Sequence, residues 1–289
     1  MSQAPVGQRR QFRFAIAAVT RRFAARADEV DGDDAWTAHL LGVQRSVGRQ
    51  PATRRTRDAV AGHEQLTRAL YWSSVFARDH GVPLRTWITD DVPGSTFALP
   101  ELLARSGIDY FVGGMNTTFG GRVTAPGHAD RPFWWVGPDG SRVLSWITFD
   151  SYAEAFQYGF SFFDNLAAMF DKLAAKLPEQ DEAGYPWPEL LLLRGFDNHY
   201  QGFHARNLID QWNATYATPR FELTTVEEFL DMMRSKYGDA AFPEFSGDFG
   251  AAWSASHAGA QHTNDRVRQS HREGRAAELG AAALTEATT

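Results

Sequence analysis

Three aspartates stand at the ends of apolar segments that have the length of β-strands. Asp90 and Asp91 follow the stretch Leu84–Thr89, and Asp197 follows the four leucines Leu190–Leu193. In parallel α/β folds the catalytic groups lie where the strands end at their carboxyl side, because the loops there share one crevice. Two carboxylates that face one crevice suit the cleavage of a glycosidic bond, in which one attacks and the other donates a proton. The alternative is that each aspartate only caps the helix that follows its strand.

The segment Asp197-Asn-His-Tyr200 is a second group of residues whose side chains could take part in catalysis or binding. It closely follows the leucine run, and titratable groups at the edge of an apolar sheet are those whose pKa values shift. His199 is interpreted either as a proton-transferring partner or as an ordinary loop histidine. Among the tryptophans, Trp87 and Trp253 are candidates for stacking against a substrate ring, whereas most of the others are expected in the core.

The composition limits the classes of function. The chain has 289 residues, of which 43% are hydrophobic, and a formal net charge of -6. This length allows one large α/β domain or two smaller ones, and the acidic balance argues against a nucleic-acid surface. Because cysteine is absent, a metal would have to be held by His, Asp, Glu or backbone oxygen. Nothing in the sequence indicates an oligomeric state.

The N-terminal apolar run Phe14–Val19 is too short for a signal-peptide core or a membrane span. We therefore expect a soluble, cytoplasmic protein with no membrane partner.

We divide the chain into three parts. Residues 1–61 form an atypical N-terminal segment, in which the arginine-rich residues 42–60 lack helix or strand periodicity. These residues are interpreted as an exposed basic linker, or as residues foreign to the fold, for example through a shifted reading frame. Residues 62–242 are expected to form an α/β catalytic domain, and residues 243–289 a helical tail.

Periodicity and capping signals predict alternating helices and strands after residue 62. The segment 84–112 indicates a strand, a helix that ends at Arg105, and a second strand, which together make a βαβ unit with parallel strands. Residues 133–147 predict a β-hairpin, which we interpret as an excursion from the repeating pattern. Further helices are predicted over 63–80, 165–177, a segment through Leu208 and Trp212, 226–237 and about 264–284, and further strands over 189–194 and from Phe221.

Several motifs together resemble the N-terminal catalytic domain of glycoside hydrolase family 38, the α-mannosidase family. The first is Trp87-Ile-Thr-Asp-Asp-Val-Pro-Gly-Ser95, followed by a helix and Gly107-Ile-Asp-Tyr-Phe111. In that family an Asp follows a Trp-containing strand and a Gly stands three positions later. The spacing to Gly94 selects Asp91, whereas counting from Trp87 selects Asp90; we prefer Asp91, because the turn glycine fixes how the chain leaves the strand. The other matching segments are Gly137-Pro-Asp-Gly-Ser-Arg-Val-Leu144, Gly195-Phe-Asp-Asn-His-Tyr200, Trp212-Asn213 and Thr224-Thr-Val-Glu-Glu-Phe229. The resemblance covers about residues 62 to 250.

The resemblance implies a (β/α)7-type barrel, here partial and followed by a short helical segment, and a carbohydrate substrate. It implies a retaining mechanism in which Asp91 is the nucleophile and Asp197 the general acid/base. The family also uses a divalent metal, usually zinc, for which Asp91 and His257 are the candidate ligands in this sequence. The candidate substrate-binding residues are Trp87, Asp90, Asn198, His199, Tyr200 and Trp253.

The sequence departs from the family pattern at both ends. The family's His-x-Asp-x-Gly-Trp motif, which supplies two metal ligands, does not occur in residues 1–60, and the family's large C-terminal β-rich domains are missing. We therefore expect an incomplete chain, and a non-catalytic carbohydrate-binding remnant is the alternative function. A metal-dependent deacetylase would need a His-x-x-x-His pair, whereas His199 and His204 are five residues apart.

Overall fold

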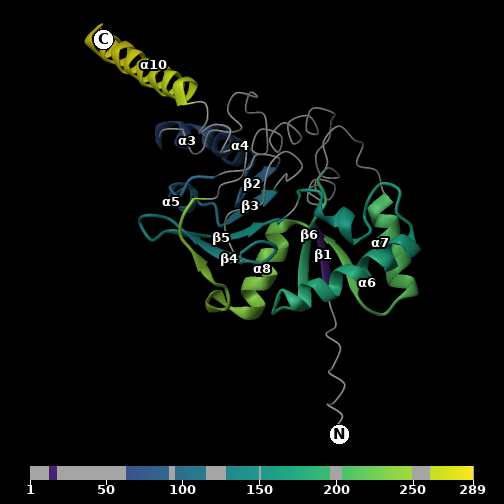
Figure 1. The fold of residues 1–289 in the computed structure, drawn as a ribbon. Helices are drawn as coiled ribbons and strands as arrows, with labels where there is room; N and C mark the ends of the chain where they lie inside the picture. Colours follow the sequence, from purple (N-terminus) through teal and green to yellow (C-terminus); the bar gives the residue numbers. More distant parts are fainter. Residues whose placement is uncertain are drawn as a thin grey trace.

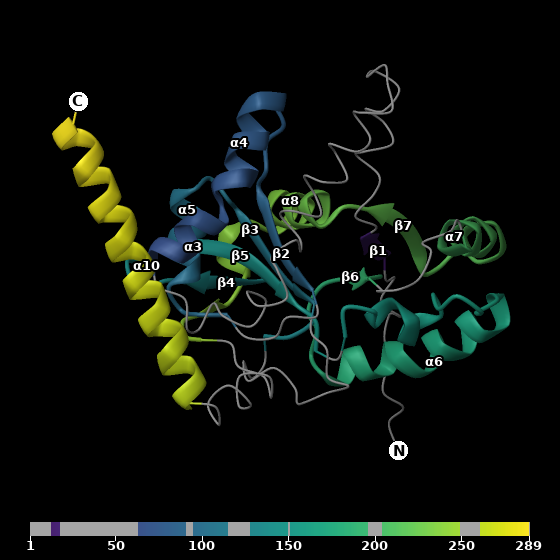
Figure 2. The same cartoon turned by 90° about the horizontal axis from the view of Figure 1, so that it is seen from above.

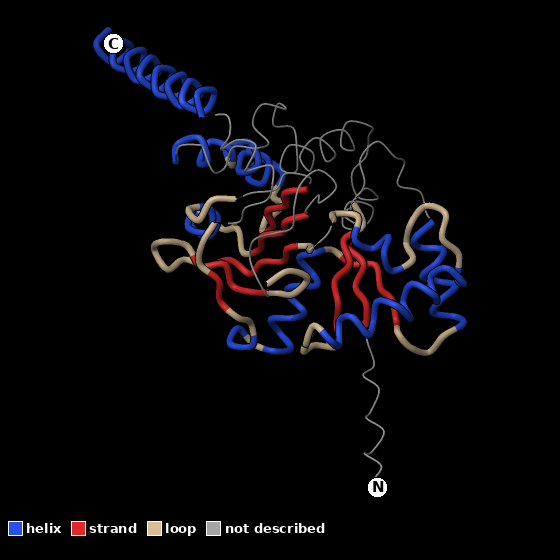
Figure 3. Tube along the Cα trace, viewed as in Figure 1, coloured by secondary structure: helices blue, strands red, loops and turns tan. Residues whose placement is uncertain are grey.

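A computed structural model describes residues 13–17, 63–90, 95–114, 128–149, 151–195, 204–248 and 261–288. Within these residues the strands form two β-sheets surrounded by helices (Figure 1 and Figure 3). The predicted α/β class is therefore confirmed. None of the described helices is both long and apolar enough to cross a membrane.

The smaller sheet has the strand order β6-β1-β7, in which β1 spans Arg13–Ala17, β6 Glu189–Leu193 and β7 Arg220–Thr224. The strands are parallel, and Ala17 pairs with both Leu193 and Thr224, so the three carboxyl ends lie level. The leucine run of β6 is buried throughout, as its sequence predicts. The central strand β1 lies in the segment 1–61, for which we predicted no strand. The short apolar run at residues 14–19 did not by itself predict a strand. The strand is defined by its hydrogen bonds to β6 and β7, which are distant in sequence.

The larger sheet has the strand order β2-β3-β5-β4-β8. The bounds are β2 Thr86–Asp90, β3 Tyr110–Gly114, β4 Phe133–Val136, β5 Arg142–Ile147 and β8 Glu244–Phe245. The predicted βαβ unit is confirmed, because β2 and β3 are parallel and are joined through α5 (Leu99–Arg105).

The hairpin β4-β5 is also confirmed, and it departs from the repeating βα pattern because its two strands are antiparallel and follow each other without a helix. Within the sheet β5 lies parallel to β3, whereas β4 and its parallel neighbour β8 run the other way. The two-residue strand β8 continues the sheet beside β4, beyond residue 242 where we expected the α/β part to end.

The helices follow the predicted positions closely. Their bounds are α3 His63–Ala69, α4 Tyr71–His80, α6 Leu166–Glu182, α7 His204–Thr215, α8 Val226–Tyr237 and α10 Gln261–Thr288. The one helix predicted over residues 63–80 is divided into α3 and α4 by a turn at Leu70. The predicted capping box at the start of α8 is present, with Thr225 and Glu228 each bound to the other's backbone N–H. The helix α10 lies at the outer edge of the molecule, where Glu278 forms an ion pair with Arg68 of α3 (Figure 2).

Two hydrophobic clusters hold the sheets together. Alternate residues of a strand point to opposite faces, so Tyr110 and Val112 of β3 enter one cluster and Phe111 enters the other. The first cluster also contains the leucines of β6 and the buried face of α8, and it therefore joins both sheets into one core. The helix α8 contacts both β1 and β3 and lies between the sheets (Figure 2).

Candidate active site

The carboxyl ends of strands from both sheets meet at one rim. Thr148, which follows β5, donates from its backbone N–H to the Gly113 carbonyl of β3 at 3.0 Å. Gly195, which follows β6, donates to the Tyr152 carbonyl at 2.8 Å. We call the residues that follow these strand ends the carboxyl-end rim. It brings the exits of β3, β5 and β6 together, and β1 and β7 end level with β6.

Most of the expected site residues lie outside the described residues. Asp90 is the last residue of β2, and the structure describes its backbone but not its side chain. The other candidates outside the described residues are Asp91, Asp197, Asn198, His199, Tyr200, Trp253 and His257. Asp91 is nevertheless the residue after β2, and Asp197 is the second residue after Gly195. Their roles stay predictions.

Trp87 is the candidate whose side chain the structure describes. It is half-buried in β2 and packs against the cluster that contains Phe111 and the leucines of α5. Its indole Nε1 is buried and has no hydrogen-bond partner among the described residues. Buried N–H groups in proteins normally donate to a hydrogen-bond acceptor. Trp134, Trp135 and Trp146 are buried, which confirms the expectation that most tryptophans belong to the core.

Arg194 is a residue of this rim that the sequence analysis missed. It follows β6 directly, and its Nε donates to the carbonyl of Phe160 at 3.0 Å. Its guanidinium lies 5.7 Å from the ring centre of Phe156 and 5.2 Å from that of Phe162, which is cation–π geometry. Burial lowers the pKa of Arg194, but an arginine stays charged at any physiological pH. The side chain thus attaches residues 151–165, which we call the rim loop, to the exit of β6.

A second cation holds the rim loop from its other side. Lys172 of α6 donates to the Phe156 carbonyl at 2.9 Å and to the Asp164 carboxylate at 2.8 Å. Burial opposes ionisation of Asp164, but hydrogen bonds from Lys172 and Ser161 outweigh it, so the pKa of Asp164 lies below its usual value. Two basic side chains therefore hold the loop, Arg194 to the exit of β6 and Lys172 to α6.

The rim loop also carries a buried carboxylate. Glu154 is only 3% exposed and is the first residue of the 3-10 helix Glu154–Tyr158. Burial, and then the negative charge of Glu154, raise the pKa of the Tyr158 hydroxyl, which accepts a hydrogen bond from Gln180 at 2.8 Å. No periodicity or motif in the sequence pointed to this acid.

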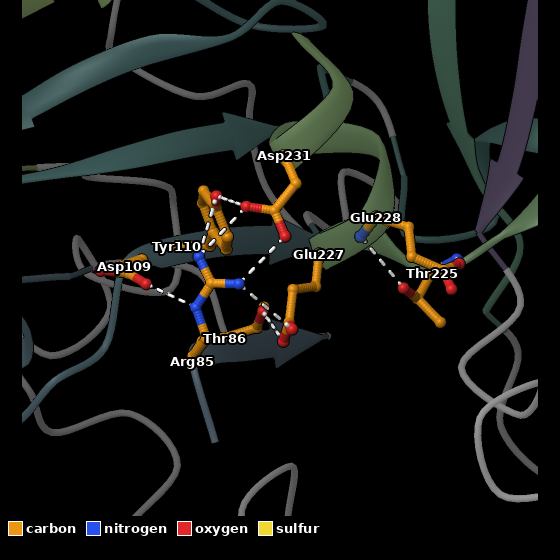
Figure 4. Close-up of polar contacts among 8 residues, drawn as sticks. All are labelled: Arg85, Thr86, Asp109, Tyr110, Thr225, Glu227, Glu228 and Asp231. Carbon is orange, nitrogen blue, oxygen red and sulfur yellow. Dashed lines mark hydrogen bonds and ion pairs between the residues drawn. The ribbon is translucent and has the colours of Figure 1, made fainter. Parts of the chain in front are cut away.

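The opposite ends of the strands carry a different kind of polar cluster, shown in Figure 4. Arg85, just before β2, donates to Asp109 at 2.6 Å and makes two hydrogen bonds to Asp231 of α8 at 3.0 and 3.1 Å. It also pairs with Glu227 at 3.5 Å, and Tyr110 donates to Asp231. The hydrogen bonds to Asp231 and Asp109 raise the pKa of Arg85. We call this group the amino-end cluster.

The same helix also holds the start of the smaller sheet. Glu189, the first residue of β6, accepts hydrogen bonds from Lys236 at 2.5 Å and from the Tyr237 hydroxyl at 2.6 Å. Both donors belong to α8. The amino ends of the two sheets are therefore joined by ionic contacts through one helix.

No group of three or more His, Asp or Glu side chains that could hold a metal occurs among the described residues. The expected ligands Asp91 and His257 lie outside them. His128-Ala-Asp130, which has metal-ligand spacing, is engaged otherwise: Asp130 accepts from the Phe149 N–H at 2.8 Å, and His128 packs on Phe133 and Phe245.

The two sheets and their helices define a mixed α/β domain. The chain is similar to the crystal structure of an α-mannosidase from Enterococcus faecalis V583, with a TM-score of 0.52 and 15% sequence identity. The similarity covers 67% of this chain but only 21% of the α-mannosidase, so the chain spans about a fifth of that protein's length. At this identity the similarity shows the fold alone.

The family is shown by the sequence. Residues 57–248 match the model of the glycosyl hydrolases family 38 N-terminal domain, and the chain belongs to this family. The predicted resemblance is thereby confirmed, including its extent. A comparison with curated proteins gave no match.

Proposed function

We propose that this chain is a retaining glycosidase that cleaves α-mannosides, with Asp91 as nucleophile and Asp197 as general acid/base. The observation that carries the proposal is the family match over residues 57–248, which includes both aspartates. Its second support is the carboxyl-end rim, where the exits of strands from both sheets are linked. We further propose that the two sheets are parts of one (β/α)7-type barrel.

In the proposed reaction, protonated Asp197 donates its proton to the glycosidic oxygen while the Asp91 carboxylate attacks the anomeric carbon. The glycosidic bond breaks, the leaving group departs as an alcohol, and the sugar stays bound to Asp91 as an ester. Asp197 then removes a proton from a water molecule whose oxygen attacks the anomeric carbon, so that the bond to Asp91 breaks and Asp197 is protonated again. In a retaining enzyme the two carboxyl groups lie about 5 to 5.5 Å apart. This mechanism requires Asp197 to be protonated at the start of the cycle.

The sugar would be held by the side chains near these two acids. The proposed substrate-binding residues are Trp87, Asp90, Asn198, His199, Tyr200 and Trp253. We also propose a divalent metal, zinc, held by Asp91 and His257, since a carboxylate and an imidazole are suitable zinc donors. A bound zinc would keep Asp91 ionised and orient sugar hydroxyls. Because these are two donors and zinc in proteins usually has four ligands, the proposed reaction assigns no step to the metal.

The test is hydrolysis of an aryl α-mannoside by the purified chain, with and without added zinc. Asp91→Asn and Asp197→Asn should each lower kcat by about 10³-fold or more, because each removes a group that acts on the reacting bond. Asp210→Asn is the control and should retain most of the activity, since it changes an exposed acid of α7 that has no role in the proposed reaction. Hydrolysis that survives both of the first two substitutions would refute the proposed site.

A second candidate function is carbohydrate binding without catalysis. It is favoured by the absence of the His-x-Asp-x-Gly-Trp motif from residues 1–60. A chain of this kind would bind mannosides with and without zinc but would hydrolyse none. The division into residues 1–61, 62–242 and 243–289 likewise stays a proposal, which limited proteolysis would test at residues 42–60.

A further inference from the structure

The rim loop presents one aromatic side chain to solvent. Phe163 is 90% exposed, the highest value among the large hydrophobic residues of the described chain. Its neighbours in the loop are not exposed in this way: Phe160 is fully buried and packs edge-on against Phe221 of β7 at 5.2 Å. Phe162 packs edge-on against Phe156 at 5.0 Å. No described aromatic ring packs against Phe163.

The exposure of Phe163 does not come from a loose backbone. Gly159 starts this part of the loop at φ +96°, and a Cβ there would lie 2.4 Å from the Cα of Met169, so the loop touches α6 directly. On the C-terminal side, Asp164 accepts from the Ser161 N–H at 2.8 Å and is bound by Lys172. Asn165 then caps α6 by accepting from the Ala168 N–H at 3.0 Å. Phe163 is therefore held in water between fixed neighbours.

Phe163 belongs to a loop that is attached to the carboxyl-end rim. Its neighbour Phe162 is under the guanidinium of Arg194, and Arg194 binds the Phe160 carbonyl. Arg194 follows β6 directly and precedes Asp197 by three residues. The loop that carries Phe163 is thus attached to the strand exit that leads to the proposed acid/base.

We propose that Phe163 is a stacking platform for a sugar ring of the substrate, beyond the ring that is cleaved. This inference rests on the proposed function for the identity of its ligand. A pyranose has an apolar face of C–H groups that packs on an aromatic ring, and a rigid aromatic costs little conformational entropy when it binds. The platform would favour oligosaccharides over small mannosides, because an aryl mannoside has no second sugar ring to reach it.

The experiment is affinity electrophoresis of the full chain through native gels that contain soluble yeast mannan, with dextran gels as the control. Phe163→Ala should weaken mannan binding about tenfold, the effect typical of removing a stacking aromatic. Phe163→Trp should bind as well as the wild type, because it keeps an aromatic face. Phe170→Ala is the matched control. Phe170 is also an exposed aromatic (49%), but it packs on Trp212 of α7 and on Tyr216, which follows α7, so its substitution should leave binding unchanged.

Kinetics separate this inference from the proposed function. Phe163→Ala should raise KM for a mannotriose about tenfold while leaving KM and kcat for an aryl α-mannoside unchanged. If the wild type hydrolyses mannosides but Phe163→Ala binds mannan normally, the platform is refuted and the proposed function stands. If the wild type binds mannan through Phe163 without hydrolysis, the platform stands and the catalytic proposal fails.

Two other results would overturn the platform. One is a wild type that neither binds mannan nor hydrolyses mannosides, which refutes both proposals. The other is a wild type that is dimeric by size-exclusion chromatography and becomes monomeric in Phe163→Ala, because Phe163 would then bind a second copy of the chain. Since Phe163 is exposed, its substitution should change the free energy of unfolding by no more than about 0.5 kcal/mol.

Discussion

The two ends of the strands use charged residues in different ways. At the amino end, Arg85 is bound by carboxylates from two other elements, and Glu189 is bound by Lys236 and Tyr237. At the carboxyl end, Arg194 and Lys172 donate to backbone carbonyls of the rim loop. The amino-end contacts therefore fix helix α8 to both sheets, whereas the carboxyl-end contacts fix the shape of one loop. In parallel α/β folds this is the expected division between stability and function.

The largest effect on stability should come from removing the cation at the amino end. Arg85→Met leaves Asp109, Asp231 and Glu227 without their shared partner, and we expect it to lower the free energy of unfolding by about 2 kcal/mol. The estimate is modest because these carboxylates are partly exposed and water replaces part of the lost interaction. Urea unfolding followed by tryptophan fluorescence measures the change.

The control for this variant is Arg78→Met. Arg78 pairs with Asp79 at 2.9 Å on the surface of α4, and its loss should cost less than about 0.5 kcal/mol. Below its unfolding transition Arg85→Met should keep the wild-type kcat. A large loss of kcat in a fully folded Arg85→Met chain would show that the amino end is not purely structural.

At the carboxyl end, removing the cation should affect activity more than stability. Arg194→Met keeps the apolar stem but loses the bond to the Phe160 carbonyl and the contacts with two rings, so the rim loop and the exit of β6 can shift. We expect kcat to fall about tenfold with KM nearly unchanged, because a small displacement of the acid/base affects the reacting bond more than sugar binding. Stability should fall by about 1 kcal/mol.

Arg220→Met is the matched control at the amino end of the strands. Arg220 starts β7 and also donates to a backbone carbonyl, that of Asn213 at 3.0 Å, but far from the rim along the strand. It should leave kcat unchanged. Arg194→Lys should restore part of the activity, since it keeps the charge but not the planar group that stacks on the rings. Equal kinetics in Arg194→Met and Arg220→Met would remove the proposed distinction between the two ends.

How far the sequence predicted these features depends on how local each signal is. The strand β6 and the helix α8 were predicted because four leucines and the pair Thr225 and Glu228 carry their own pattern. The strand β1 and the sheet position of β5 were not, because each is defined by a neighbour that is distant in sequence. Arg194 was missed for the same reason: its carbonyl and ring partners come from a loop more than thirty residues earlier. The motifs around Asp91 and Asp197 identified the family but could not define the geometry between the two acids.

The smallest expected effect is the pH dependence of the amino-end cluster. Burial opposes ionisation of Asp231, but hydrogen bonds from Arg85 and Tyr110 outweigh it, and the pKa of Asp231 lies below its usual value. A depressed pKa means that ionised Asp231 stabilises the folded chain above the unfolded-state pKa, about 3.9, and that this contribution is lost as the pH falls through the lower folded value. Because Asp231 is partly exposed, the contribution should be less than about 1 kcal/mol.

Urea midpoints measured between pH 6 and pH 3 should therefore fall less steeply in Asp231→Asn than in the wild type. The control is Asp210→Asn, which removes an exposed acid of α7 and should follow the wild-type curve. Parallel curves for Asp231→Asn and the wild type would mean that the amino-end cluster holds the sheets by packing rather than by charge.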